Sequence, residues 1–338
     1  MSRADEIACG LVAHLRTTLG RPGLELAVPP VPLTGGFDTE IVTFQLRAGP
    51  AAWAGPLVLR ILRAHHDPAM VLREQATQNT LADLGYPAPR VLLATLDPAP
   101  LGAPFLVMAR IPGVQLISAG LIGMHRALLD AQRRLHALDA APLARALGDA
   151  ATFEGYLAAL ERRIERAALT GLAASMRWLR EHRPPPAPLA ICHGDLHPQN
   201  ILVEGGRVSG VLDWPNAIVA EPAFDVASTR NILRFVPAGL ASVPRGLRWL
   251  ARVGQPVLAA RYVAGYRKRH PIDANRLAYY EVAAAMRALV RAGETRSRAA
   301  GGPPLGPLDR SAYAARLAAH ATRVSGVAVT LPPAPGEP

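Results

Sequence analysis

The pattern of apolar residues changes once along this chain, and this change restricts the fold more than any other feature of the sequence. A helical pattern at 3–19 is followed, up to about residue 110, by short alternating runs typical of strands, with one further helical pattern at 69–86. Farther along, apolar residues recur at helical spacing, for example at 121–138 and 153–169. The sequence therefore predicts an α+β protein with a small β-rich N-terminal part and a larger, mainly helical C-terminal part.

Length and composition indicate a globular protein. Its 338 residues are enough for one large or two moderate domains, and 50% of them are hydrophobic. No apolar run reaches the roughly 18 residues of a membrane helix, and residues 1–20 resemble an amphipathic helix more than a signal peptide. Two cysteines, Cys9 and Cys192, are too few for a disulfide framework. We therefore expect a cytoplasmic protein with free thiols and no membrane partner.

Positive charge is concentrated in one region. Between 231 and 320 there are 15 Arg or Lys residues and 4 acids, a difference that equals the formal net charge of +11 of the whole chain. Such an excess fits nucleic acid, an acidic surface or an anionic substrate, and it also fits a genome that favours arginine codons. Aromatic residues are few among the basic ones and do not form the interleaved pattern that a nucleic-acid-binding surface built on base stacking would use. We therefore expect no nucleic-acid partner.

The segment CHGDLHPQN, residues 192–200, gathers side chains that can carry chemistry. His193 and His197 are four positions apart, as two metal ligands on one helix would be. Gly194 and Pro198 disfavour a continuous helix at this point, however. A polar loop is therefore a better prediction than a helical metal site.

The next stretch, 201–214, has two β-rich runs around a glycine pair and predicts a hairpin. Because a hairpin brings its ends together, Asn200 just before it is expected to lie beside Asp213 at its end. Two oxygen ligands there can hold Mg²⁺ on nucleotide phosphates. The carboxylate of Asp195 can orient an attacking hydroxyl and accept its proton. This is the arrangement that a phosphoryl-transfer site needs.

The pattern H-G-D-x-x-x-x-N followed by L-D-W resembles the catalytic and metal-binding segments of the aminoglycoside phosphotransferase family. That family is similar in fold to the eukaryotic protein kinases. The resemblance implies that Asp195 is the catalytic base and that Asn200 and Asp213 are Mg²⁺ ligands. It also implies that His193 braces the loop.

The segment EPAFDVAS at 221–228 is similar to the G-D-P-x-x-D-L-A segment of the family, with Glu221 where Asp is usual. It implies that Asp225 is a buried acid that ties the catalytic loop to the following helix. The resemblance also implies a bilobal, protein-kinase-like fold. The expected parts are a nucleotide-binding lobe with a leading helix, a catalytic and substrate lobe, and a disordered tail, at 1–110, 111–325 and 326–338.

The N-terminal part resembles the nucleotide-binding lobe of the same family. The stretch LTGGFDTEIVTF is similar to the glycine-rich turn whose backbone amides contact phosphates. It implies contacts from Thr34, Gly35, Gly36, Phe37, Asp38 and Thr39. Arg60 aligns with the phosphate-binding cation, where protein kinases have lysine, and Glu74 is expected to hold it. The stretch FLVMARIPG resembles the hinge, which implies adenine contacts from the backbone of Met108, Ala109 and Arg110.

The sequence thus predicts a small-molecule kinase that uses Mg²⁺ and transfers the γ-phosphate of ATP or GTP to a hydroxyl of an antibiotic or metabolite. Because the segment after residue 230 is basic, we expect a neutral, monocationic or anionic acceptor and not a polycationic aminoglycoside. The protein is expected to be a monomer or a homodimer. Two other classes stay open. One is a kinase-like nucleotide-binding module without catalysis, since the usual lysine is missing; the other is a metal hydrolase built on His193, Asp195 and His197.

Overall fold

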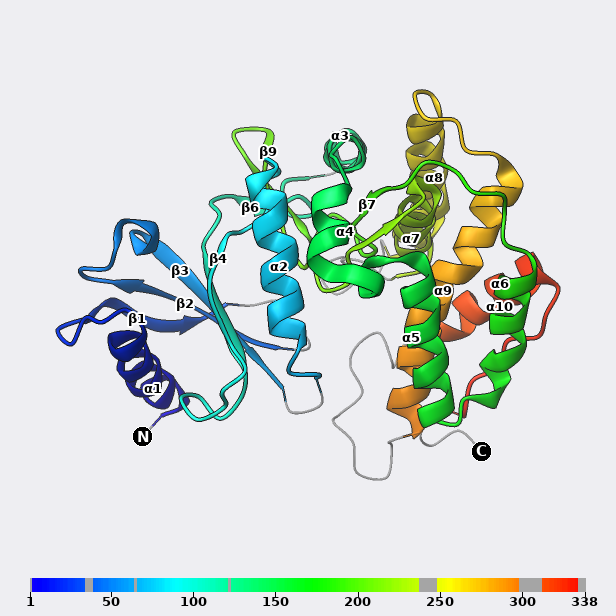
Figure 1. The fold of residues 1–338 in the computed structure, drawn as a ribbon. Coiled ribbons are helices and arrows are strands. Elements are labelled where there is room, and N and C mark those ends of the chain that lie inside the picture. Colours follow the sequence, from blue (N-terminus) through cyan, green and yellow to red (C-terminus); the bar gives the residue numbers. More distant parts are fainter. Residues whose placement is uncertain are drawn as a thin grey trace. The chain divides into compact units, whose positions relative to one another are not determined.

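The computed structural model describes residues 2–33, 39–63, 66–120, 123–236, 248–297 and 312–333, without the side chains of 248–253. The chain divides into two compact units, each with its own architecture (Figure 1). The N-terminal unit consists of Met1–Val114 together with Leu202–Pro215. The C-terminal unit consists of Gln115–Ile201 together with Asn216–Pro338.

A five-stranded antiparallel sheet forms the centre of the N-terminal unit, with the strand order β1-β2-β3-β5-β4. The strands are β1 (Leu26–Pro32), β2 (Thr39–Leu46), β3 (Pro56–Leu62), β4 (Val91–Thr95) and β5 (Phe105–Ala109). The unit also contains helix α1 (Arg3–Thr18), a short 3-10 turn (Ala51–Trp53) and helix α2 (Met70–Asp83).

The alternation of side chains along β3 decides which helix each face of the sheet meets. Leu59 and Ile61 belong to a buried cluster that includes the apolar face of α1. Leu62 belongs to a second cluster with Val71 of α2. Since successive residues of a strand point to opposite faces, Arg60 lies on the face of Leu62, toward α2. The sheet thus packs against α1 on one face and against α2 on the other.

The hairpin expected at 201–214 is present as strands β8 (Ile201–Glu204) and β9 (Arg207–Val211). They form a three-stranded sheet in the order β6-β8-β9, in which β6 is Val114–Gln115. Val211 at the end of the hairpin donates its backbone N–H to the carbonyl oxygen of Pro87 at 2.7 Å. This bond attaches the end of β9 to the segment after α2.

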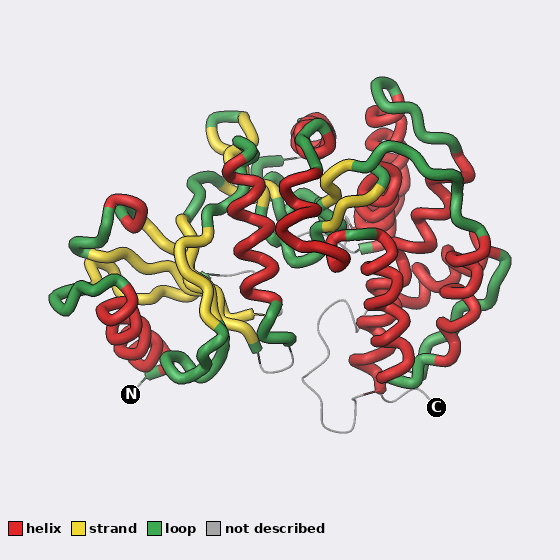
Figure 2. Tube along the Cα trace, in the orientation of Figure 1, coloured by secondary structure: helices red, strands yellow, loops and turns green. Residues whose placement is uncertain are grey.

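The C-terminal unit is mainly helical, and Figure 2 shows how few strands it contains. Its helices are α3 (Met124–His136), α4 (Ala141–Leu147), α5 (Phe153–Arg166), α6 (Ala173–Glu181), α7 (Pro222–Phe235), α8 (Arg248–Arg267), α9 (Ala274–Ser297) and α10 (Tyr313–Ser325). Helix α7 packs against both α8 and α9, and α10 packs against α9. Strands β7 (Ala190–Cys192) and β10 (Ile218–Ala220) pair antiparallel, and the candidate catalytic loop leaves the end of β7.

The predicted α+β organisation is confirmed, because strands with one internal helix follow α1 in the first part of the chain and helices dominate the second. The lobe boundaries expected from the resemblance stay a prediction. Within the expected tail, Val329 is buried and Thr330 donates its backbone N–H to the carbonyl oxygen of Gly171 at 3.2 Å. Val329 and Thr330 are therefore held within the C-terminal unit, and the extent of a disordered tail stays a prediction. In the part of the chain that the structure describes, no helix is both long and apolar enough to cross a membrane.

Candidate active site

Arg60 lies in a cluster of polar groups in the N-terminal unit. Its Nη1 donates to Oε1 of Glu74 at 2.7 Å, and its Nε donates to the hydroxyl of Thr39 at 3.1 Å. Its Nη2 lies 3.2 Å from Oδ1 of Asp213. The strand register explains the first contact, since α2 covers the face of the sheet that carries Arg60. The guanidinium group of Arg60 therefore forms ion pairs with two carboxyl groups.

Glu74 is a deeply buried member of this cluster. Its side chain is 1% exposed, and its Oε2 accepts no hydrogen bond among the described residues. Burial raises the pKa of Glu74 to about 7; the charge of Arg60 opposes this rise and Asp213 adds to it. The side-chain amide of Gln78 donates to Oε1 at 2.8 Å. Glu74 is therefore a carboxyl group that takes up a proton close to neutral pH.

Asp213 has a backbone φ of 67°, in the left-handed region that residues other than glycine rarely adopt. The following residue, Trp214, is fully buried, and its indole N–H donates to the carbonyl oxygen of Val211 at 2.8 Å. Its ring meets Tyr86 edge to face. Anchoring of the tryptophan holds the strained residue in place, while the Asp213 side chain stays 38% exposed. Strain of this kind is often kept at functional positions.

The loop after β7 is clamped on both sides of Asp195. His193 is buried, and its Nδ1 accepts a hydrogen bond from the backbone N–H of Asp195 at 3.2 Å. The side-chain nitrogen of Asn200 donates to the carbonyl oxygen of Asp195 at 3.0 Å. The Asp195 side chain itself is 26% exposed. Its backbone is thus held while its carboxylate stays accessible.

Gly194 is required by the path of this loop. Its φ is 75°, and a Cβ atom at this position would lie 2.6 Å from the carbonyl oxygen of Asn216. Its N–H donates to Oδ1 of Asp225 at 2.7 Å, and its carbonyl oxygen accepts from the hydroxyl of Ser228 at 2.6 Å. The residue before Asp195 is therefore bound to α7 at both its donor and its acceptor.

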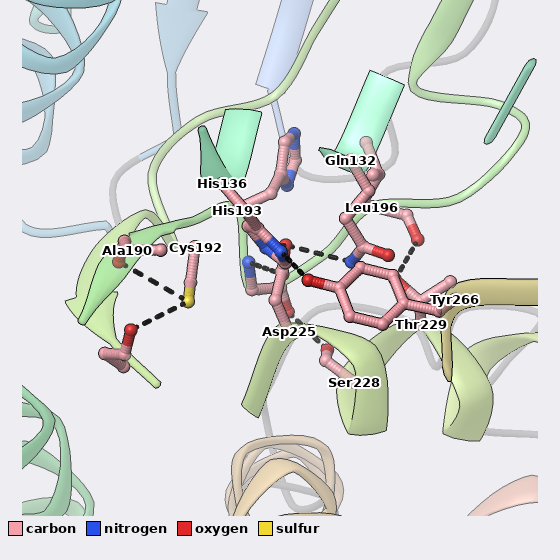
Figure 3. Close-up of polar contacts among 12 residues, drawn as sticks. Gln132, His136, Ala190, Cys192, His193, Leu196, Asp225, Ser228, Thr229 and Tyr266 are labelled. Carbon is pink, nitrogen blue, oxygen red and sulfur yellow. Dashed lines mark hydrogen bonds and ion pairs between the residues drawn. The ribbon is translucent and has the colours of Figure 1, made fainter. Parts of the chain in front are cut away.

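Asp225 is fully buried in α7 and lies at the centre of a polar network (Figure 3). Its Oδ2 lies 3.0 Å from the amide nitrogen of Gln132 and 3.0 Å from Nε2 of His136. The other ring nitrogen of His136 lies 2.7 Å from the hydroxyl of Tyr266. Burial alone would raise the pKa of Asp225, but the hydrogen bond and charge of His136 and further partners lower it below its ordinary value. An ionised carboxylate therefore holds the N–H of Gly194.

Arg287, in α9, is a candidate that the sequence motifs did not mark. Its Nη2 donates to the carbonyl oxygen of Gly194 at 2.8 Å and to Oδ1 of Asp195 at 3.0 Å. Burial would raise the pKa of Asp195, but the charges of Arg287, His197 and His193 lower it below its ordinary value. The sequence signal was a lone arginine within AAAMRALV, because a charge among small and apolar helix residues needs a partner.

Two groups of residues expected to bind the nucleotide are less well defined. Thr34, Gly35, Gly36, Phe37 and Asp38 lie outside the described residues. At the expected hinge, Ala109 donates its backbone N–H to the carbonyl oxygen of Arg90 at 3.0 Å, and Arg110 donates to that of Pro56 at 3.1 Å. Both amides are engaged within the N-terminal unit. Adenine binding by Met108, Ala109 and Arg110 stays a prediction.

The metal hydrolase alternative finds no support in the site. Among the residues that the structure describes, no three His, Cys, Asp or Glu side chains converge on a position suitable for a metal ion. Nδ1 of His197 accepts from the backbone N–H of Gln199 at 3.3 Å, and Nδ1 of His193 accepts from that of Asp195. These histidines shape the loop.

Asn200 and Asp213 have the donor atoms that Mg²⁺ prefers. The side-chain nitrogen of Asn200 is committed to the carbonyl oxygen of Asp195, which leaves the amide oxygen as the atom for a cation. The carboxylate of Asp213 is partly exposed. Hard oxygen ligands of this kind fit Mg²⁺. Because Asn200 belongs to the C-terminal unit and Asp213 to the N-terminal unit, a site shared by both stays a prediction.

Comparisons with known proteins show the family to which this chain belongs and solved structures that share its fold. The sequence profile of the phosphotransferase enzyme family, APH, matches residues 31–271. The matched range contains every site residue predicted from the sequence and ends before Arg287. An aminoglycoside 3'-phosphotransferase from Streptomyces fradiae is 29% identical over 261 residues, which cover 72% of this chain and 90% of that protein.

A homoserine kinase from Methylocella silvestris is 33% identical over 75 residues, which cover 22% of this chain and 23% of that enzyme. The chain thus matches less than a quarter of the length of this relative. Among solved structures, a thermostable mutant of aminoglycoside phosphotransferase APH(4)-Ia, in a ternary complex with ADP and hygromycin B, superposes with a TM-score of 0.61 at 16% identity. The superposition covers 95% of this chain and 99% of that chain. The predicted fold is therefore confirmed.

Proposed function

This chain belongs to the phosphotransferase enzyme family, and on that premise we propose that it is a small-molecule kinase. It transfers the γ-phosphate of ATP, or GTP, to a hydroxyl group of an antibiotic or metabolite. The observation that carries this proposal is the state of Asp195, whose accessible carboxylate has a lowered pKa. His193 and Asn200 hold its backbone from both sides, and Asp225 holds that of the residue before it.

In the proposed reaction the acceptor hydroxyl oxygen bonds to the γ-phosphorus. The bond between this phosphorus and the oxygen bridging to the β-phosphate breaks, and ADP leaves with that electron pair. The proton of the hydroxyl passes to a carboxylate oxygen of Asp195. A low pKa makes Asp195 a weak base, which suits phosphoryl transfer through a loose transition state, where positioning matters more than early proton removal.

Nucleotide binding is assigned to the N-terminal unit. Arg60 provides the cation for the phosphates, and Thr39 and Glu74 orient its guanidinium group. A planar fork can meet two phosphate oxygens where protein kinases use a lysine. Asn200 and Asp213 would hold Mg²⁺, which neutralises phosphate charge when it is bound. By the family resemblance, Thr34 to Thr39 cover the phosphates and Met108 to Arg110 contact the base.

The acceptor is the open part of the proposal. One relative is named for an aminoglycoside and another for homoserine, so relatives of this chain act on chemically different alcohols. The basic excess between 231 and 320 supports a neutral, monocationic or anionic acceptor over a polycation. Since the proposed reaction consumes ATP, we place the enzyme in the cytoplasm. We propose that it is a monomer or a homodimer.

The proposal is tested with purified protein in two steps. A thermal-shift assay compares the non-hydrolysable analogue AMP-PNP with Mg²⁺ against Zn²⁺ alone, and we expect stabilisation by the nucleotide only. ATP consumption is then followed across a panel of alcohols. Turnover with at least one acceptor supports the kinase, whereas nucleotide binding without turnover across the panel favours the non-catalytic module. Stabilisation by Zn²⁺ alone would contradict both.

A further inference from the structure

The side chains of Arg287 and Asp195 form an ion pair in which both partners are partly exposed to solvent. The two side chains are 22% and 26% exposed, and they are joined by the 3.0 Å contact between Nη2 and Oδ1. The same nitrogen is fixed by the carbonyl oxygen of Gly194 at 2.8 Å. A base must lie within roughly 2.6–3.2 Å of the hydroxyl from which it takes a proton. A molecule whose hydroxyl meets Asp195 therefore also meets the guanidinium group of Arg287.

The surroundings of this pair on α9 are cationic. Glu281 is buried in an ion pair, and Glu294 pairs with Arg163 at 2.8 Å. Arg291 follows Arg287 by one helical turn, is exposed and adds charge of the same sign. Along the described length of α9, both carboxylates are thus neutralised by other partners. An ammonium group of an acceptor would meet like charge here, whereas an anionic group would meet an attractive potential.

We propose that Arg287 selects the acceptor by binding a carboxylate or phosphate group that the acceptor carries close to the hydroxyl to be phosphorylated. This inference rests on the proposed role of Asp195 as the base. A guanidinium group presents N–H donors along more than one edge, so it can hold Asp195 with one edge and a second anion with another. Its charge lies between two anions that would otherwise repel each other. The acceptors are then hydroxy acids or phosphorylated alcohols.

The test uses matched probes that differ in the anionic group. L-Homoserine is paired with 3-aminopropan-1-ol for the carboxylate, and glycerol 3-phosphate is paired with glycerol for the phosphate. Affinities are measured by calorimetry on the protein saturated with Mg²⁺ and AMP-PNP, and KM and kcat are measured with ATP. We expect wild-type protein to bind one probe that carries the anionic group at least tenfold more tightly than its partner that lacks this group, and the pair that shows this identifies the anion.

Three variants separate a specific contact from general charge. Arg287→Gln should abolish the preference and raise KM for the anionic acceptor, with little change in KM for ATP. Arg287→Lys should keep part of the preference, because it keeps the charge without the fork. Arg291→Gln, which removes an exposed arginine from the same helix, should keep most of the preference, because Arg291 adds to the general potential and has no proposed contact with the acceptor.

Three results would overturn the proposal. They are no binding of either anionic probe, an equal preference in Arg287→Gln, and tighter binding of the polycation kanamycin than of any anionic probe. The failure of the kinase assignment looks different, because wild-type protein would then either not bind AMP-PNP with Mg²⁺ or bind it and consume no ATP with any acceptor of the panel. Normal ATP turnover without anion preference removes only the role of Arg287.

Discussion

The Arg60–Glu74 pair of the N-terminal unit and the Arg287–Asp195 pair of the C-terminal unit are alike in geometry, with contacts of 2.7 and 3.0 Å. Their carboxyl groups nevertheless differ in proton affinity. The pKa of Glu74 is raised to about 7 mainly by burial, whereas that of Asp195 is lowered because its cationic neighbours outweigh its burial. An ion pair in itself therefore does not fix the charge state of its acid.

The difference follows from burial first and from the neighbouring charges second. Glu74 lies near Asp213 as well as Arg60, and the repulsion from Asp213 adds to the effect of its burial on its pKa. Asp195 faces Arg287 together with two histidines, and its side chain is 26% exposed where that of Glu74 is 1% exposed. In the first arrangement two carboxyl groups, Glu74 and Asp213, face one arginine, and the excess of acids would suit a cation bound together with a nucleotide. The second keeps an ionised carboxylate, as the proposed role of Asp195 as base requires.

The largest expected effect separates the two regions by function. Asp195→Asn should lower phosphate transfer by roughly 10²–10⁴-fold, because the base is lost, while AMP-PNP with Mg²⁺ still stabilises the protein. Asp213→Asn should lose both transfer and nucleotide stabilisation. Initial rates of ATP consumption and thermal shifts measure the two properties. A wild-type rate in Asp195→Asn would break the division.

The next effect concerns stability. Arg60→Met should destabilise the protein by roughly 2–4 kcal/mol at pH 8, because it leaves Glu74 buried without its cation. The loss should be smaller at pH 6, where Glu74 binds a proton. Urea unfolding at both pH values measures this, with Arg63→Met as the control, since Arg63 is exposed and should change stability by less than about 0.5 kcal/mol. Equal losses for both variants would show that Arg60 is an ordinary surface cation.

Backbone strain at Gly194, next to the proposed base, gives a smaller effect. Gly194→Ala should cost about 2–3 kcal/mol, the left-handed backbone accounting for about 1–2 of this and the clash with Asn216 for the rest. Gly205 at the hairpin tip is the matched control, because it also has positive φ but a Cβ there meets nothing within 4 Å. Gly205→Ala should cost about 1 kcal/mol. Unfolding curves that coincide for the two variants would remove the steric argument for Gly194.

The smallest effect is a change in pH dependence. The folded-state pKa of Glu74, about 7, lies above the ordinary value of 4.5, so the folded state binds more protons between these pH values. Its stabilising contribution is complete below pH 4.5 and is lost as pH rises through 7. Between pH 6 and pH 8, Glu74→Gln should flatten the stability profile by about 1 kcal/mol, which is part of the roughly 3 kcal/mol that the whole pKa shift represents. An unchanged slope would place the proton on another group.

Local patterns were enough to predict the elements that carry the site. Alternation in PLVLRILR indicated a strand, and the face of the sheet that carries Arg60 then follows from the period of two. The glycine pair between two β-rich runs indicated the hairpin that ends near Asp213. The spacing in HGDLHPQN predicted that Asp195 and Asn200 lie close together on one loop, and the hydrogen bond between them confirms this.

Contacts between distant segments were not predictable in this way. Arg287 is 92 residues from Asp195 in the sequence, and Gln132 is 93 residues from Asp225. Helical periodicity indicates which face of a helix is buried but not which partner it meets. The pairing depends on how α3, α7 and α9 pack, and no short motif records that packing. The raised pKa of Glu74 could not be predicted from the sequence either, because it depends on how deeply the side chain is buried in the folded protein.

The most direct measurement identifies the product of the reaction by phosphorus NMR. Wild-type protein, ATP, Mg²⁺ and the acceptor panel are incubated together, and we predict that the γ-phosphate signal is replaced by that of a phosphate ester on an alcohol oxygen. Asp195→Asn should give no such signal under the same conditions. An ester formed equally fast by Asp195→Asn, or inorganic phosphate as the sole product with every acceptor, would contradict the assignment of Asp195 as the base of an alcohol kinase.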